Sequence, residues 1–195
     1  MQYDYEREYT AACDRTQSFN LNAPALGQRS PRQFSDRHCP RLGGLIYELV
    51  RELEPKDLVG QCFAVHLASA PLIEKEFGVS AVPTLGWISL SDEELFHTEE
   101  QDLLRYMSEG APSRQMNLHC WLTLSSFEIV DITIATSFAI VNGIDKGLGG
   151  VLAKHWSELT GGVQYHPQLV GEEYLERTGM MLNIPMHQLA GQQWR

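Results

Sequence analysis

The chain has 195 residues, of which 15 are basic and 25 acidic, for a net charge of −10. This length suits one domain that can bury a core without disulfides or a metal ion. The acidic excess excludes a general binder of the nucleic-acid backbone, because such proteins need positive charge to displace counterions. No apolar stretch approaches the ~20 residues that span a bilayer.

The first ten residues, MQYDYEREYT, lack the basic and apolar regions of a signal peptide. The four cysteines, Cys13, Cys39, Cys62 and Cys120, form no C-x-x-C pair. Together these features predict a cytoplasmic protein with free thiols, most of them small buried hydrophobes. We expect neither nucleic acid nor a membrane among its partners.

The first half of the chain predicts two helices after an irregular arm. Residues 1–37 are polar and rich in Asn, Gln and Ser, which is typical of an irregular N-terminal arm. Residues 43–54 carry Leu, Ile and Val at helical spacing, and a proline follows as a stop. Residues 62–77 predict a more apolar helix that ends at Gly78. Pro71 should kink or restart that helix, because proline lacks the backbone donor.

The second half carries the strand signals. Residues 79–90 predict a strand, and its proline favours a sheet edge or a bulge. Residues 92–110 are acidic and partly helical, and 118–124 with 128–134 give the clearest hairpin signal in the chain. The rest of the chain reads as a glycine-rich loop over 142–150 and short helices over 151–159 and 172–179.

Helices that precede strands indicate an α+β fold rather than alternating βαβ units. We expect residues 1–195 to form a single domain. Within it, residues 58–134 would be the core, and residues 135–195 a C-terminal extension packed on that core.

Cys62 is the candidate nucleophile, because it stands at the first position of the predicted helix 62–77. Unpaired N–H groups at a helix N-terminus lower the pKa of a thiol and can stabilise an oxyanion. A general base is also needed. His66 shares a helix face with Cys62 but lies one turn deeper, whereas His119 begins the predicted hairpin and is the better candidate.

The hairpin geometry couples His119 to Asp131. If the loop consists of the three residues 125–127, Trp121 opposes Asp131, and His119 lies diagonally from Asp131 on the same face. A two-residue loop would place the two side chains on opposite faces. Asp131 also lies within an apolar run, where a buried carboxylate needs a charged or donating partner. A thiol, an imidazole and an orienting carboxylate form a catalytic triad.

These residues resemble motifs of the transglutaminases and the wider papain-like cysteine superfamily. Gly60-Gln61-Cys62-Phe63-Ala64 is similar to their nucleophile motif, and His119-Cys120-Trp121 with Asp131-Ile132-Thr133 to their histidine and aspartate strands. Gly78-Val79-Ser80-Ala81 and Gly86 resemble the intervening strand. The resemblance covers residues 58–134, about 40% of the chain, and is nearest to bacterial transglutaminase-like proteins.

The resemblance implies a papain-like or transglutaminase-like core, with the nucleophile helix packed on an antiparallel sheet. Cys62 would attack an amide or ester carbonyl, His119 would act as base and then acid, and Asp131 would orient His119. Gln61 would help to hold the oxyanion and Trp121 would wall the cleft, although a helix-cap role for Gln61 and a core position for Trp121 are alternatives.

The thioester formed on the cysteine would pass to water in a hydrolase or to an amine in a transferase. The substrate would be a peptide, a protein or a small amide, and no cofactor is implied. Val82 and Phe63 replace the usual arginine and tryptophan, and the acidic insertion 92–117 is long. These departures leave the substrate open and keep a non-enzymatic binding or scaffold protein as the alternative. The acidic insertion should disfavour strongly acidic substrates.

Metal and phosphate sites are not predicted. The seven histidines include no H-E-x-x-H pattern, and the pairs His38-Cys39 and His119-Cys120 would point to opposite sides of an extended chain. The glycine-rich loop 142–150 lacks the spacing and the Lys-Ser/Thr ending of a phosphate-binding loop.

Overall fold

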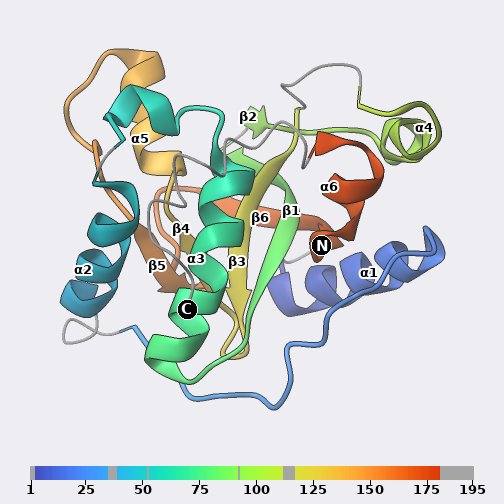
Figure 1. Ribbon diagram of the computed structural model, residues 1–195, viewed down its shortest axis with the longest axis horizontal. Coiled ribbons are helices and arrows are strands. Elements are labelled where there is room, and N and C mark those ends of the chain that lie inside the picture. Colours follow the sequence, from blue (N-terminus) through green and yellow to red (C-terminus); the bar gives the residue numbers. More distant parts are fainter. Residues whose placement is uncertain (1–2, 35–38, 52, 92, 112–116, 181–195) are drawn as a thin grey trace.

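A computed structural model describes residues 3–34, 39–51, 53–91, 93–111 and 117–180. Helices cover a single antiparallel sheet, as the α+β prediction requires (Figure 1). The helices are α1 (Tyr5–Ser18), α2 (Cys39–Val50), α3 (Cys62–Phe77), α4 (Glu100–Glu109), α5 (Ile134–Asn142) and α6 (Glu173–Arg177), with 3-10 turns η1 (Pro55–Leu58) and η2 (Trp156–Glu158). The strands are β1 (Ala81–Leu90), β2 (Glu93–Leu95), β3 (His119–Leu124), β4 (Glu128–Asp131), β5 (Leu152–His155) and β6 (Val163–Val170).

Strand β1 pairs with three other strands. On one side it pairs with β3 along its first half and with β2 along its last residues, and on the other side it pairs with β6. Strands β4 and β5 continue the sheet beyond β3. Of the two alternatives predicted from the proline, the sheet edge is therefore wrong, whereas the bulge agrees with the register shift between Leu85 and Gly86. Pro83 is tolerated because the β6 ladder begins only at the next residue, Thr84, and a register shift follows between Leu85 and Gly86.

The two faces of the sheet pack against different helices. Helix α3 crosses the face toward the viewer in Figure 1 and contacts β1 and β3. Leu122, Leu124 and Val130 belong to the core cluster on that side. Trp121 and Ile129, one position along in their strands, belong instead to the cluster that contains residues of α1. This division follows from the strand period of two, which sends successive side chains to opposite faces.

Several local predictions are confirmed. Helix α3 spans the predicted residues, and Gly78 ends it in the left-handed conformation with φ 66°. The helix continues through Pro71 and is not restarted there. Helix α2 begins before the predicted residue 43 and ends at Val50. Strand β3 closely follows the predicted segment 118–124, and α6 lies within the predicted segment 172–179.

The irregular arm predicted over residues 1–37 is wrong for its first half, which forms α1. Asp4 caps this helix by accepting a hydrogen bond from the Arg7 amide. The buried face of α1 consists of Tyr5, Tyr9, Ala12 and Thr16, so it is aromatic and polar rather than aliphatic. That composition hides the face from a hydropathy pattern, although the spacing is helical.

Three further segments differ from prediction. The expected helix over 151–159 is strand β5 followed by the 3-10 turn η2, because 152–155 pairs with β4. Strand β6 had not been predicted, since Pro167 interrupts its apolar pattern. The expected strand 128–134 ends at Asp131, and α5 begins at Ile134.

Candidate active site

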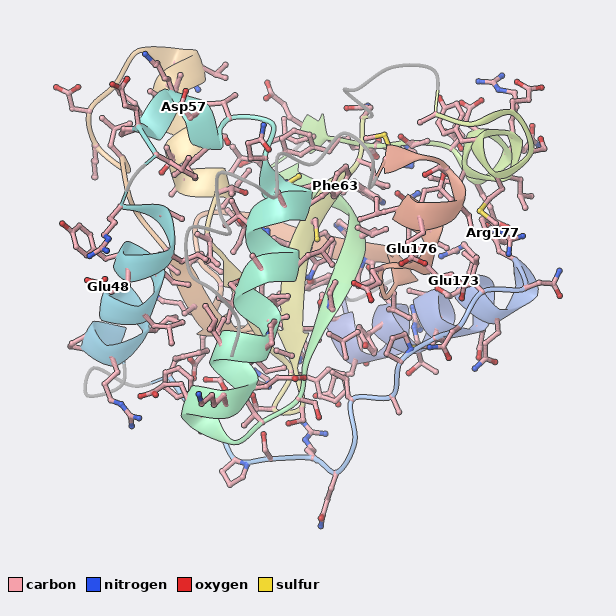
Figure 2. The ribbon with its side chains drawn as sticks, in the orientation of Figure 1. Glu48, Asp57, Phe63, Glu173, Glu176 and Arg177 are labelled. Carbon is pink, nitrogen blue, oxygen red and sulfur yellow. The ribbon has the colours of Figure 1, made fainter. Side chains whose placement is uncertain are left out.

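Three elements bring Cys62, His119 and Asp131 together. Cys62 begins α3, His119 begins β3, and Asp131 ends β4. The β3–β4 register pairs Leu122 with Val130 and Thr123 with Ile129, which is the register predicted for a three-residue loop. Figure 2 shows Phe63 in the first turn of α3 and Asp57 in the preceding turn η1, both at the same end of the molecule.

The buried Asp131 carboxylate is held by donors from three directions. His119 Nε2 lies 2.6 Å from Oδ2, and the Tyr165 hydroxyl donates to the same oxygen at 2.9 Å. Oδ1 accepts hydrogen bonds at 3.0 Å from the backbone N–H groups of Thr133 and Ile134. These bonds also satisfy amides at the start of α5, so the aspartate both orients the imidazole and caps a helix.

The positive charge of His119 and the negative charge of Asp131 stabilise each other. Burial acts to lower the pKa of His119, but the charge and hydrogen bond of Asp131, together with the Cys62 side chain, raise it to about 10. Burial acts to raise the pKa of Asp131, yet His119, His66 and the backbone hydrogen bond from Ile134 hold it well below its ordinary value. The site therefore holds an imidazolium and a carboxylate at neutral pH.

Cys62 faces the same imidazole. A side-chain hydrogen bond with Cys62 and the charge of its sulfur are among the causes that raise the pKa of His119. Since Asp131 occupies Nε2, the ring nitrogen left for Cys62 is Nδ1. Cys62 is partly exposed, whereas His119 is 3% exposed. The order thiol, imidazole and carboxylate is thus realised in space.

A cavity of about 550 Å³ opens beside Cys62 and His119. It is lined by Val59, Gly60, Cys62, Phe63, Leu90, Glu93, Leu95, Phe96, Asn117, Leu118, His119, Thr133, Ile134, Ser137, Phe138, Val141 and Asn142. The Phe96 ring stacks on the His119 ring, with centroids 5.0 Å apart and planes at 22°. Phe96 has φ 66°, a conformation that costs energy in a bulky residue and is frequent at functional sites.

His66, the other candidate base, hydrogen-bonds to backbone groups rather than to the Cys62 side chain. Its Nε2 accepts a hydrogen bond of 2.9 Å from the Ile132 amide, so its Nδ1 carries the proton and donates to the Cys62 carbonyl at 2.7 Å. Burial lowers the pKa of His66 to about 4, because the opposing attraction of Asp131 is smaller. His66 is therefore neutral and joins the start of α3 to the end of β4.

Two residues predicted at the cleft lie outside the lining of the cavity. Trp121 is fully buried, donates from Nε1 to the Tyr5 hydroxyl, and belongs to the core, so the core position expected as the alternative is confirmed and the place in the cleft wall is not. Gln61 is the N-terminal cap position of α3, makes no side-chain cap hydrogen bond, and does not line the cavity. The backbone N–H groups of the first turn of α3 remain the oxyanion donors of choice.

The sequence analysis did not predict that Tyr165 belongs to the site. It comes from β6, and only the pairing of that strand with β1 brings its hydroxyl to Asp131. No short motif surrounds it that could have signalled this role.

The other cysteines do not share this environment. Cys120 is fully buried, and burial raises the pKa of its thiol well above the ordinary value. Cys13 is partly buried, and burial likewise raises its thiol pKa. The side chain of Cys39 lies outside the described residues. Over the described ranges, no cluster of three or more His, Cys, Asp or Glu side chains could hold a metal ion.

No protein-family model, curated protein or solved structure matches this chain. Among the helices that the structure describes, none combines the length and the hydropathy needed to cross a membrane.

Proposed function

We propose that the protein is a cysteine-dependent acyl-transfer enzyme that hydrolyses or transfers an amide or peptide acyl group. The single observation that carries this proposal is the position of His119, which is bound by Asp131 through Nε2 and lines the same cavity as Cys62. In its finer form the proposal assigns the chain a transglutaminase-like core, on the motifs of residues 58–134.

The proposed mechanism begins with a thiolate on Cys62 beside the protonated His119. The Cys62 thiolate, paired with the His119 imidazolium, attacks the carbonyl carbon, and the carbonyl electrons move to an oxyanion near the N–H groups of α3. The tetrahedral intermediate collapses, the carbon–nitrogen bond breaks, and His119 gives its proton to the leaving amine. A thioester remains on Cys62.

The second half of the reaction, deacylation, returns the enzyme to its starting state. Neutral His119 takes a proton from water or from an acceptor amine, which then attacks the thioester. The carbon–sulfur bond breaks and leaves the thiolate beside the imidazolium. Asp131 keeps the ring oriented throughout, since its Oδ2 accepts from Nε2 in both steps.

Alkylation by iodoacetamide near neutral pH tests the thiolate directly. We expect stoichiometric labelling of Cys62, identified by mass spectrometry, and a rate at least tenfold lower in His119→Ala. The control His97→Ala removes a partly exposed histidine that does not line the cavity and should retain the wild-type rate. If Cys62 is inert while Cys13 or Cys39 reacts, the triad is wrong.

Product analysis separates hydrolysis from transfer. An acylated Cys62 that yields only free acid, even with an added amine, identifies a hydrolase; formation of the new amide identifies a transferase. A protein that binds amides without ever acylating Cys62 would instead be the non-enzymatic binding protein.

A further inference from the structure

The cavity beside Cys62 is apolar over most of its lining, although it opens beside charged groups. Phe63, Leu95 and Phe96 line it from α3 and the β2 segment. Its volume of about 550 Å³ falls within the range of about 300–1,000 Å³ typical of small-molecule sites. A catalytic site that only positioned water and a polar amide would not need so large an apolar surface.

One face of α5 completes the cavity. Ile134, Ser137, Phe138, Val141 and Asn142 line it, with the helical spacing i, i+3, i+4, i+7 and i+8. Phe138 is 44% exposed and Val141 is 76% exposed, so large apolar side chains of this face are left in contact with solvent. An apolar surface of this kind is stabilised when a ligand removes it from water.

The charges around the cavity restrict what can enter. Among the described residues that line it, Glu93 is the one acidic residue. The His119 imidazolium is already paired with Asp131, so the described part of the lining offers no unpaired cationic side chain to a carboxylate. An anionic group would meet the like charge of Glu93, whereas a neutral hydrocarbon group would be accommodated by the apolar side chains that form most of the lining.

We propose that this cavity is an acyl-binding site, which takes an uncharged aliphatic or aromatic acyl group and places its carbonyl at the Cys62 sulfur. This inference rests on the proposed function and specifies its substrate class. Val141 and Phe138 would contact the far end of the acyl chain, and Phe96 would lie against it beside His119.

Acylation by p-nitrophenyl esters tests the site. The acetate, butyrate and hexanoate esters differ only in chain length, and the monoglutarate ester adds a terminal carboxylate. The rates of p-nitrophenolate release are each divided by the rate of the same ester with glutathione, and mass spectrometry confirms that Cys62 is acylated. We expect the hexanoate to react at least tenfold faster than the acetate, and the glutarate at least tenfold more slowly than the hexanoate.

Two variants of α5 test whether the preference for longer acyl chains depends on the cavity face of this helix. Val141→Asp places a carboxylate on the cavity face and should lower the ratio of the hexanoate rate to the acetate rate at least fivefold. Ile140→Asp is its matched control, because Ile140 is 38% exposed on the same helix and does not line the cavity. It should retain the wild-type preference.

The outcomes separate the inference from the proposed function. If iodoacetamide labels Cys62 in a His119-dependent manner but the four esters react at equal normalised rates, the acyl site is wrong and the triad stands. Equal effects of Val141→Asp and Ile140→Asp also overturn the acyl site. If Cys62 reacts with neither iodoacetamide nor any ester, the proposed function fails and the acyl site fails with it.

Discussion

The Asp131 carboxylate sets the protonation state of His119, because it is fully buried and bonds Nε2 at 2.6 Å. In Asp131→Asn the charge that raises the pKa of His119 is lost, so burial should bring this pKa from about 10 to its ordinary value of about 6.5 or below. At pH 8 we expect His119 to be neutral and the rate of Cys62 alkylation to fall at least tenfold.

NMR titration of His119 and the pH profile of iodoacetamide labelling measure this effect. Asp57→Asn is the control, because it removes the same charge from an exposed residue of η1. An Asp131→Asn protein whose His119 still titrates near pH 10 would show that the carboxylate is not the cause.

Neutral His66 contributes to the free energy of unfolding, and this contribution decreases as the pH falls. Its pKa is about 4 in the folded protein against an ordinary value of 6.5, so between these values the unfolded chain binds a proton that the folded protein does not. The stabilisation from neutral His66 is thus complete above pH 6.5 and is lost as pH falls through about 4. From pH 7 to 4.5 this loss amounts to roughly 2–3 kcal/mol.

Urea unfolding of His66→Gln tests this prediction, since glutamine offers an acceptor for the Ile132 amide but does not titrate. The stability gap between wild type and His66→Gln should narrow by roughly 2–3 kcal/mol between pH 7 and 4.5. Ile73→Val alters a buried side chain that does not titrate. Its difference in unfolding free energy from the wild type should therefore be the same at both pH values. A His66→Gln gap that widens at low pH would contradict the neutral, Nδ1-protonated form.

At the scale of elements, the close approach of β1 and β6 depends on Gly86, which also stands opposite His119 in the β1–β3 ladder. A Cβ added there would lie 2.1 Å from the His166 carbonyl oxygen and 2.9 Å from the Trp121 ring. Gly86→Ala must therefore separate the strands or displace Trp121. We expect a loss of about 3 kcal/mol or more of unfolding free energy.

Gly44→Ala is the matched substitution, because Gly44 is exposed in α2 and a Cβ there meets nothing within 4 Å. It should stabilise the protein by about 0.5–1 kcal/mol through its higher helix propensity. Urea denaturation measures both variants, and a Gly86→Ala protein of wild-type stability would contradict the packing described for β1.

The elements that sequence predicts are those whose signals are local. Helix α3 carries its own start, apolar content and Gly78 terminus, and the parity of the loop 125–127 alone decides the β3–β4 register. Helix α1 and strand β6 were missed because they stabilise each other across the chain. The Tyr3 hydroxyl, near the start of α1, donates to the Tyr165 carbonyl, and neither segment is strongly apolar by itself.

The same distinction applies to the site. The proximity of Cys62, His119 and Asp131 was predictable, because motif order and hairpin parity are properties of short segments. The Tyr165 hydroxyl and the two hydrogen bonds of His66 depend on which strands become neighbours, so no pattern around those residues indicates them. Gln61 and Trp121 were placed at the cleft by resemblance alone, without a packing argument.

At the scale of the whole molecule, the net charge of −10 should select among reagents that approach Cys62. Close to the sulfur, the imidazolium of His119 lies between two anionic groups, the proposed Cys62 thiolate and Asp131, and Glu93 adds a further negative charge among the described residues of the cavity lining. A cation is therefore attracted and an anion repelled along the approach. Long-range attraction of this kind weakens as salt shortens the Debye length from about 30 Å at 0.01 M to about 3 Å at 1 M.

Two methanethiosulfonates of similar size, one with a trimethylammonium and one with a sulfonate group, measure this selection at Cys62. After division by their rates with a small neutral thiol, we expect the cationic reagent to react about tenfold faster at 10 mM salt and nearly equally at 1 M. Glu93→Gln should reduce the ratio at low salt, whereas Glu48→Gln, an exposed change on α2, should alter it less. If the anionic reagent is faster at low salt, the helix N-terminus and the imidazolium, rather than the net charge, control access to the sulfur.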